Sequence, residues 1–490
     1  MDMMDGEEFI DDLNYARSSI EKEFDIHDCD RPTQLGRGTQ AHLGQFPVLD
    51  NEIAHSIKVR SKPSDMISRI TRAKASTYVS TVKMLLGRES NYSGKGRFSS
   101  ADCCHVLSRY VPVNGPWIID KTESRAYTSQ FSADGTFFIT GFQDRNIRIY
   151  DVDNGWKVQK DIRAKNLSWT ITDTSLSPDQ RFLVYSSMSP IVHIVNVGTP
   201  GTLSIANVNE IHEELDFSGN ADGGRRFSIF SVNFSSDGRK LVAGSNDHCL
   251  YIYDMEANKP TLRILAHEDD VNTVSFADES GNLIYSGSDD SFCKVWDMRC
   301  TLSGDRPSGV LVGHLEGITF LDSRRDGHYF ISNGKDQTTK LWDIRKMASS
   351  IRRPSSLCSR RRKFSYSEWD YRWMDYPAHR KDVKHPNDQS VATYRGHSVL
   401  RTLIRCYFSP ASSTGQKYIY TGSNDGCVYI YDVISGALVG KTAYHDTTVR
   451  DCSWHPHFPM LISSGWDGIV AGWEISERDQ MNRKKSQHKK

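Results

Sequence analysis

The sequence has no net charge, no long apolar run and no paired cysteine motif. Its 490 residues contain 61 Lys and Arg against 61 Asp and Glu. This balance excludes a protein that coats nucleic acid or a membrane surface through overall positive charge. No run of 18 apolar residues occurs, and the N-terminus is acidic where a signal peptide would be basic. We therefore expect a soluble protein made in the cytosol, with no membrane partner.

The ten cysteines are scattered and show none of the CxxC spacing of zinc ribbons or thioredoxin-like sites. Free thiols are the expected state in a reducing compartment. Cys452, His455 and His457 lie close together in the sequence, but their spacing does not match a familiar ligand set. No loop has the context of a phosphate-binding motif either. We expect neither a metal nor a cofactor.

A repeat dominates residues 125–474. Seven short segments end in an aromatic or aliphatic residue followed by an acidic or amide residue, and their last residues are Asp151, Asn196, Asp254, Asp297, Asp343, Asp432 and Glu474. Successive separations are 45, 58, 43, 46, 89 and 42 residues. A period of about 40 to 45 residues with four short strands per unit is typical of WD40 propellers. We predict an all-β fold, a seven-bladed WD40 propeller, over residues 105–475.

The longest separation contains an insertion at residues 346–388, which lacks strand alternation and a terminal Trp-Asp and so favours seven blades over eight. Only sixteen residues follow Glu474. Residues 476–490 form a basic tail, too charged to supply the outer strand of the last blade. We therefore expect a closing strand within residues 105–122, which pairs the two ends of the ring.

Residues 1–104 are predicted to form an N-terminal arm that is partly helical and partly disordered. The first thirty residues hold eleven acidic residues against two basic ones. Apolar residues recur at spacings of three and four near 9–24 and 65–86, which predicts two helices. Gly87 is a plausible end for the second. Each helix could pack on its own domain or be held for a partner.

Histidines, hydroxyl residues and aspartates recur in step with the repeat. They predict a buried hydrogen-bond relay in four units, joined by the Trp indole where Trp is present. One set, read alone, resembles a hydrolase triad. Because the set recurs, a structural bond is favoured over catalysis, and we expect no enzymatic activity. The predicted relay residues are His267, Ser286, Asp290, Trp296, His314, Ser332, Asp336, Trp342, His397, Thr421, Asp425, His445, Ser463, Asp467 and Trp473.

The insertion combines a basic run, Arg360–Lys363, with the aromatic cluster Trp369, Tyr371 and Trp373. The favoured interpretation is a loop whose basic part is an import signal and whose aromatics fasten it to the propeller. Contact with a client peptide is the second interpretation. Stacking on nucleic acid is the least favoured, although basic residues interleaved with aromatics are compatible with it.

Two neighbouring units continue past Trp-Asp to an arginine, giving the pairs Asp297 with Arg299 and Asp343 with Arg345. Guanidinium groups at the ends of adjacent strands would lie side by side and could bind a partner's carboxylates in a bidentate manner. The alternative is that each arginine pairs with an acidic residue of its own domain.

The two Trp-Asp-x-Arg segments that end in Arg299 and Arg345 are here called boxes. They resemble the paired boxes of the WD40-repeat substrate receptors of cullin-4 RING ubiquitin ligases (DCAF class). The segments QDRNIRIYD, EWDYRWMDYP and TAYHDTTVRDCSWHP are most similar to the family of WD repeat-containing protein 23 and its plant relatives. The resemblance spans residues 60–475. It implies docking on the ligase's propeller adaptor through Asp297, Arg299, Asp343 and Arg345, with an N-terminal helix near 64–87 also in contact.

The function implied by the resemblance is therefore that of a non-catalytic substrate-recognition subunit, found in the nucleus and cytoplasm. Its partners would be the adaptor, the cullin-4 core and an unidentified client protein, with Trp369, Tyr371 and Trp373 as candidate client contacts. The alternative is a WD40 scaffold in a nuclear complex for RNA processing or chromatin, in which the arginine pair is incidental.

Overall fold

The computed structural model describes residues 52–61, 81–89, 98–197, 212–218, 227–300, 306–348 and 369–475. All of them belong to one compact unit, Val48–Lys490. The predicted helix near 9–24, residues 65–80 of the second predicted helix, the basic run at 360–363 and the tail at 476–490 lie outside the described residues.

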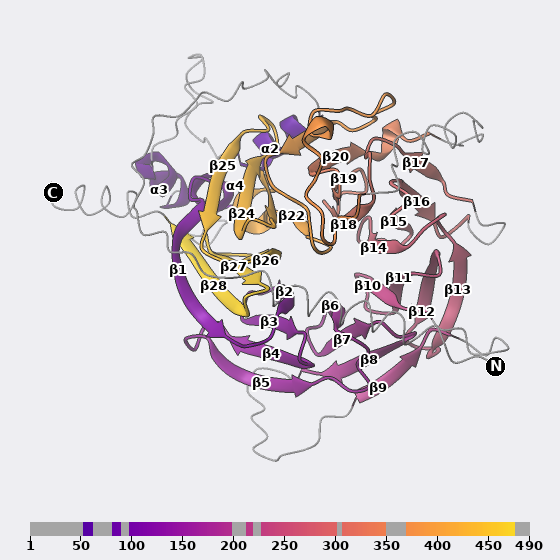
Figure 1. Ribbon diagram of the computed structural model, residues 1–490. Helices are drawn as coiled ribbons and strands as arrows, with labels where there is room; N and C mark the ends of the chain where they lie inside the picture. Colours follow the sequence, from indigo (N-terminus) through magenta and orange to yellow (C-terminus); the bar gives the residue numbers. More distant parts are fainter. Residues whose placement is uncertain are drawn as a thin grey trace, which may run out of the picture. The chain divides into compact units, whose positions relative to one another are not determined.

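Seven four-stranded antiparallel sheets form a ring (Figure 1), so the seven-bladed propeller is confirmed. The first three sheets contain β2 (Ala126–Phe131), β3 (Phe137–Phe142), β4 (Asn146–Asp151) and β5 (Lys157–Arg163), then β6 (Ile171–Leu176), β7 (Phe182–Ser187), β8 (Ile191–Asn196) and β9 (His212–Asp216), then β10 (Ile229–Phe234), β11 (Lys240–Ser245), β12 (Cys249–Asp254) and β13 (Lys259–Leu265).

The remaining four sheets follow the same order. They contain β14 (Val271–Phe276), β15 (Leu283–Ser288), β16 (Cys293–Asp297) and β17 (Gly309–Leu311), then β18 (Ile318–Ser323), β19 (Tyr329–Gly334), β20 (Thr338–Asp343) and β21 (Ala392–Arg395), then β22 (Cys406–Phe408), β23 (Tyr418–Gly422), β24 (Cys427–Asp432) and β25 (Leu438–Ala443), and last β26 (Val449–Trp454), β27 (Leu461–Gly465), β28 (Ile469–Ile475) and β1 (Pro112–Lys121).

Strand β1 is the outer strand of the seventh sheet. It pairs antiparallel with β28, from Pro112 opposite Ile475 to Lys121 opposite Ile469. The strand lies inside the span 105–122 that the sequence indicated, although residues 105–107 belong to a helix instead. Strand β1 therefore covers the edge of β28 and joins the first and last parts of the ring in one sheet.

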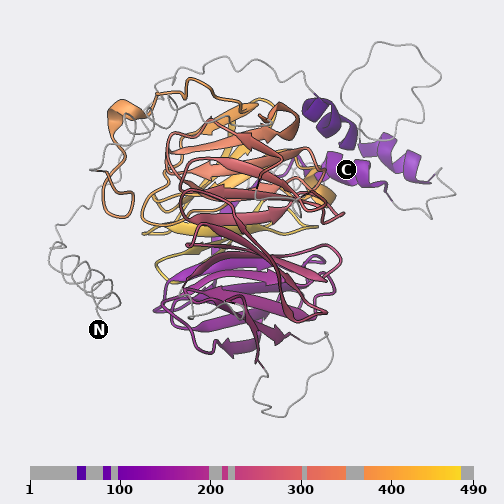
Figure 2. The same cartoon turned by 90° about the vertical axis from the view of Figure 1, so that its right-hand side faces the viewer.

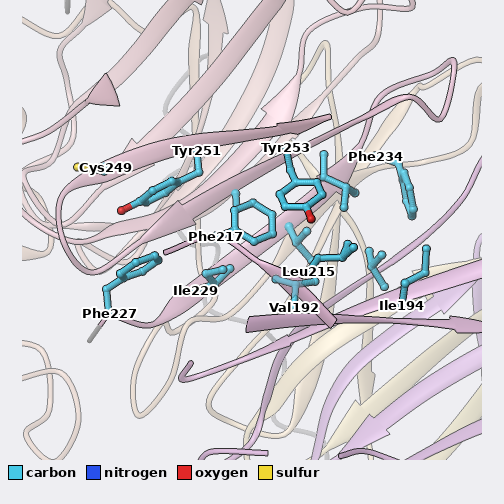
Figure 3. Close-up of a cluster of buried hydrophobic side chains, with 14 residues drawn as sticks. Val192, Ile194, Leu215, Phe217, Phe227, Ile229, Phe234, Cys249, Tyr251 and Tyr253 are labelled. Atoms are coloured by element: carbon cyan, nitrogen blue, oxygen red, sulfur yellow. The ribbon is translucent and has the colours of Figure 1, made fainter. Parts of the chain in front are cut away.

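Apolar side chains fill the spaces between neighbouring sheets. Between the second and third sheets, Val192, Leu215 and Phe217 on one side pack against Tyr251 and Tyr253 on the other, all in one buried cluster (Figure 3). Burying a large apolar side chain contributes about 1.5 to 3 kcal/mol. Because similar clusters recur around the ring, each sheet is stabilised mainly by its two neighbours.

The polar relay is assembled in the fourth, fifth and seventh sheets, the three whose third strand carries Trp. In the fourth sheet, His267 Nδ1 lies 2.8 Å from Asp290 and His267 Nε2 lies 2.7 Å from Ser286 Oγ. The Trp296 indole donates to the same Oγ at 2.9 Å. The equivalent contacts in the other two sheets join His314, Ser332, Asp336 and Trp342, and His445, Ser463, Asp467 and Trp473.

The relay predicted for the sixth sheet is wrong. His397 binds Tyr431 Oη at 3.1 Å and Asn333 Oδ1 at 3.0 Å, and neither Thr421 nor Asp425. Asp425 instead accepts from Tyr429 at 2.7 Å. The physical reason is the residue that replaces Trp: a tyrosine hydroxyl reaches the histidine directly and leaves no role for a bridging hydroxyl.

Helices α2 (Glu52–Arg60), α3 (Thr81–Glu89), α4 (Ser100–Leu107) and α6 (Ala411–Thr414) complete the described structure, with the 3-10 turns η3 (Ile344–Lys346) and η4 (Ala378–Arg380). Helix α3 continues past Gly87, so the predicted helix end is wrong. Helices α2 and α4 were not predicted. None of the helices in the described ranges has both the length and the hydropathy needed to span a bilayer.

Helices α2 and α4 pack on the propeller and are not part of a free arm. Ile53 and Ile57 of α2 are buried in a cluster with Tyr329, Phe408 and other residues of the fifth and sixth sheets. On α4, Cys104 Sγ lies 3.3 Å from the Ala411 carbonyl of α6. Ser99 caps α4 through a reciprocal bond with Asp102, which fixes where the helix begins.

Candidate functional site

The ring has two faces, because successive antiparallel strands reverse direction. The connections that follow each third strand emerge on one face, here called the arginine face after Arg299 and Arg345. Turns between second and third strands emerge on the other, here called the aromatic face after Trp169, Tyr371 and Trp466. Helices α2, α3 and α4 lie on one side of the ring and the orange segment around η4 reaches the other (Figure 2).

Arg299 extends from the end of β16 and is held by its own box. Its Nε and Nη2 donate to the two oxygens of Asp297 at 2.9 and 2.7 Å. The side chain is 66% exposed, while that of Asp297 is 15% exposed. Hydrogen bonding from the guanidinium lowers the pKa of the Asp297 carboxyl. The aspartate therefore orients the arginine and leaves most of it open to solvent.

Arg345 occupies the equivalent position after β20 and makes the same pair of bonds, to Asp343 at 2.9 and 2.9 Å. It has two further partners. Its Nη2 donates to Tyr329 Oη at 2.7 Å, and its Nη1 donates to Glu52 at the start of α2. Its exposed fraction is correspondingly lower, at 44%. Burial alone would raise the pKa of Asp343, but the bonds from Arg345 lower it.

Further contacts fasten α2 beside Arg345. Ser56 Oγ accepts from the buried Arg324 at 2.8 Å, and Arg60 donates to Gln416 at 2.5 Å. Gln416 also accepts from Arg324 at 3.2 Å. The helix therefore covers part of the arginine face where the fifth and sixth sheets meet. Tyr329 and Glu52 were not among the predicted site residues; the spacing of Ile53 and Ile57 is a sequence signal from which a helix could have been predicted there.

The insertion returns across the aromatic face. Arg401 donates its backbone N–H to the Tyr371 carbonyl at 2.8 Å, and the Lys335 ammonium lies 3.8 Å from the Tyr371 ring centre. Burial opposes the charge of Lys335, but Tyr371 and Asp289 hold its pKa above the ordinary value. Tyr371 therefore fastens the insertion to the turn that follows β19.

The other two aromatic candidates differ from Tyr371. Trp369 donates its indole N–H to the Asp375 carbonyl at 2.9 Å and packs edge-on against the buried Tyr376. Trp373 is 58% exposed, with the Arg372 guanidinium 4.6 Å from its ring centre. Of the three predicted client contacts, Trp373 is thus the one that presents most of its surface to solvent.

More aromatics gather on the same face nearer the centre of the ring. Tyr127 contacts both Trp169 and Trp466, with ring centres 5.7 Å apart in each case. Trp169 is 48% exposed, and the Arg125 guanidinium lies 4.6 Å from the Trp466 ring centre. The aromatic face thus offers exposed rings with adjacent cations.

Buried charges connect distant sheets around the centre of the ring. Arg405 donates to Asp173 of β6 at 2.7 Å and lies 3.4 Å from Asp451 of β26. Tyr407 donates to Asp451 at 2.8 Å. Arg405 directly precedes β22 of the sixth sheet, whereas β6 belongs to the second sheet. The network therefore connects strands of sheets that are not neighbours in the ring.

One cluster in the described parts of the chain has the ligand spacing of a possible metal site. It consists of His248, Asp269 and Asp270, whose ligand atoms lie within 4.8 Å of one another. Burial and the neighbouring carboxylates of Asp289 and Asp269 raise the pKa of Asp270 to about 6. Cys452, His455 and His457, which lie close together in the sequence, are not such a group: His455 contacts the Gly135 carbonyl and accepts from the backbone of His457.

Comparison with known proteins first gives the repeat family. The WD40 model (WD domain, G-beta repeat) matches residues 123–151, 217–254, 258–297, 305–343, 388–432 and 436–474. Residues 152–216, which include the second sheet, are not matched. This sheet has Ser189 and Val195 where the other repeats have Asp and an aromatic residue.

The curated relatives extend the similarity over most of the chain. A LEC14B homolog of Prunus armeniaca is 65% identical over 432 residues, covering 88% of this chain and 89% of the relative. The LEC14B protein of Lithospermum erythrorhizon is 61% identical, covering 88% and 90%. The DDB1- and CUL4-associated factor 11 homolog of Caenorhabditis elegans is 34% identical over 463 residues, covering 92% and 76%.

Proposed function

This chain belongs to the WD40-repeat family that includes LEC14B and DDB1- and CUL4-associated factor 11, and on that premise we propose that it is a substrate-recognition subunit of a cullin-4 RING ubiquitin ligase. The name of the nematode relative states an association with DDB1 and CUL4. In the proposal, DDB1 is the propeller adaptor and the chain itself is a non-catalytic receptor. Other subunits transfer ubiquitin.

The observation that carries the proposal is the pair of oriented arginines on one face. Arg299 and Arg345 extend from the third strands of neighbouring sheets, and each is held by the aspartate two residues before it. The pair is therefore pre-oriented before a partner arrives, which reduces the entropy lost on docking. A carboxylate of the adaptor is the group that a guanidinium binds best.

The client is proposed to bind on the aromatic face, opposite the adaptor. Trp373 is exposed there, and Trp169 adds a second exposed ring nearer the centre. Aromatic residues and arginine commonly anchor protein interfaces, because they bury a large area with few torsions to fix. Docking through one face would leave the other free to hold a client within reach of the ligase.

We also propose that the protein is present in both nucleus and cytoplasm, because Arg360–Lys363 and the C-terminal Lys and Arg residues have the composition of import signals. Fluorescence microscopy of the tagged full chain tests this. Replacing the four residues 360–363 by alanine should shift the protein toward the cytoplasm, whereas an unchanged distribution would count against that signal.

The function is tested by comparing the partners recovered with the wild type and with an Arg299→Ala, Arg345→Ala double variant. Adaptor and cullin-4 should be recovered with the wild type and lost from the variant, while its melting temperature stays close to that of the wild type. A matched control removes two other exposed arginines, Arg145 and Arg181, and should retain both partners. Absence of the adaptor from the wild type, or full retention by the double variant, would refute the docking proposal.

A further inference from the structure

Arg299 and Arg345 on the arginine face differ in how many N–H donors remain to bind a partner. A guanidinium has five N–H groups in a fixed plane, arranged as a side edge (Nε and Nη2) and an end edge (Nη1 and Nη2). A carboxylate needs both donors of one edge to bind in a bidentate manner. Counting the donors in use at each arginine therefore decides which of them can accept a partner's carboxylate.

Arg299 uses only its side edge. Nε and one Nη2 proton bind the two oxygens of Asp297. Among the described residues, no acceptor binds the remaining Nη2 proton or either Nη1 proton. The whole end edge is thus available on a side chain that is 66% exposed and already oriented by the aspartate.

Arg345 uses both edges. Asp343 occupies the side edge, as at Arg299. On the end edge, Nη2 donates to Tyr329 Oη at 2.7 Å and Nη1 donates to Glu52. One Nη1 proton is left, which cannot form a bidentate pair by itself. The guanidinium also lies 5.4 Å from the Tyr329 ring centre, which holds it against the fifth sheet.

From this count we propose that the two boxes have separate roles: Arg299 is the arginine that receives an adaptor carboxylate, and Arg345 is a clasp that fastens helix α2 to the propeller. The inference rests on the proposed function for its first half only. The second half concerns the chain alone. The assignment narrows the docking contact proposed above from the pair of arginines to Arg299 alone, although both boxes have the same Trp-Asp-x-Arg spacing.

The clasp acts on a helix that is otherwise held by a small contact. Within α2, the buried side chains are Ile53, Ala54 and Ile57. Hydrogen bonds from the helix to the propeller involve Ser56, Arg60 and Glu52. Glu52 is the first residue of the helix, where a carboxylate is also favoured by the helix dipole. Loss of Arg345 should therefore loosen the first turn of α2 before it affects the sheets.

The test measures adaptor affinity and α2 protection separately, on the purified full chain. Affinity for purified DDB1 is measured by biolayer interferometry, and protection of residues 52–60 by hydrogen exchange. Arg299→Ala and Arg299→Lys should each weaken the affinity about 10- to 100-fold, as expected for loss of a charge-assisted bidentate contact, with unchanged exchange in α2. Arg181→Ala, which removes another exposed arginine of the arginine face, should leave both quantities unchanged.

The two clasp variants should behave in the opposite way. Arg345→Ala and Glu52→Gln should speed exchange in α2 while changing the affinity less than about threefold. Loss of affinity with Arg345→Ala at unchanged α2 exchange would overturn the assignment, as would full affinity in Arg299→Ala. If the wild type does not bind DDB1 at all, the proposed function and the role of Arg299 both fail, whereas the exchange of α2 in Arg345→Ala still decides the clasp.

Discussion

Replacing Ser286 by alanine is the sharpest test of the relay that stabilises the fourth sheet. The hydroxyl of Ser286 is fully buried, accepts the Trp296 indole N–H at 2.9 Å and lies 2.7 Å from His267 Nε2. Ser286→Ala removes one oxygen and leaves two buried polar groups without a partner. Since each such orphan costs about 1 to 3 kcal/mol, the expected loss of unfolding free energy is about 2 to 6 kcal/mol.

This loss converts into a measurable melting shift. A ring of roughly 370 residues gains about 0.8 kcal/mol per kelvin of entropy on unfolding, at about 2.1 cal/mol/K per residue. Ser286→Ala should therefore lower the melting temperature by about 3 to 7 °C, measured by differential scanning calorimetry on the full chain. A decrease of less than about 1 °C would refute the claim that the relay stabilises the ring.

The first sheet supplies a matched control at the same position. Thr140 also stands ten residues before the last aromatic of its repeat and is fully buried, but its hydroxyl has no hydrogen-bond partner among the described residues. Thr140→Val keeps the shape and removes only the unsatisfied oxygen, so it should be neutral or stabilising. Equal destabilisation by both substitutions would show that burial at this position, rather than the relay, determines the effect.

Three further predictions concern pH, the centre of the ring and its seam. Burial lowers the pKa of His397 to about 4 from its ordinary value near 6.5. On acidification, the histidine of the unfolded chain is therefore protonated at a higher pH than that of the folded protein. As the pH falls from 6.5 to 4, the free energy of unfolding should decrease by up to about 3 kcal/mol because of this histidine. His397→Gln should therefore flatten the plot of melting temperature against pH in this range. Parallel plots for the wild type and the variant would contradict this. Arg405→Met leaves the buried carboxylates of Asp173 and Asp451 without their guanidinium partner, so urea unfolding should show a loss of about 3 to 5 kcal/mol, and an unchanged midpoint would be contrary evidence. Deleting residues 112–121 removes β1 and opens the seventh sheet, so calorimetry should show loss of the single cooperative transition, whereas a monomer that melts normally would count against closure by β1.

The ring could be predicted from the sequence because each repeat carries the same local information. The spacing of Asp151, Asp297 and the other terminal residues predicts the number of sheets, and a last unit with three strands predicts an outer strand from the N-terminal side of the repeats. Both inferences depend on chain order and strand count, which a single sequence contains. The relay was predictable only where the third strand carries Trp; at Tyr431 a different hydroxyl reaches His397, and side-chain geometry decides the outcome.

The contacts of Arg345 on the arginine face could not be predicted from the repeat pattern. Glu52 is 293 positions from Arg345 and lies on a helix of nine residues, whose short apolar pattern gives no indication of where it packs. Tyr329 is one of many tyrosines in the repeats, and nothing in its spacing marks it as a partner of Arg345. The two boxes read alike in the sequence, and only their three-dimensional neighbours distinguish them.

Reconstitution from purified proteins tests whether this chain joins a cullin-4 ligase through the adaptor. The purified full chain is mixed with purified DDB1 and cullin-4 and analysed by sedimentation velocity at micromolar concentrations. We expect a complex of all three proteins that requires DDB1, with no binding of the chain to cullin-4 alone. Independent sedimentation of the chain in the presence of both proteins would contradict it.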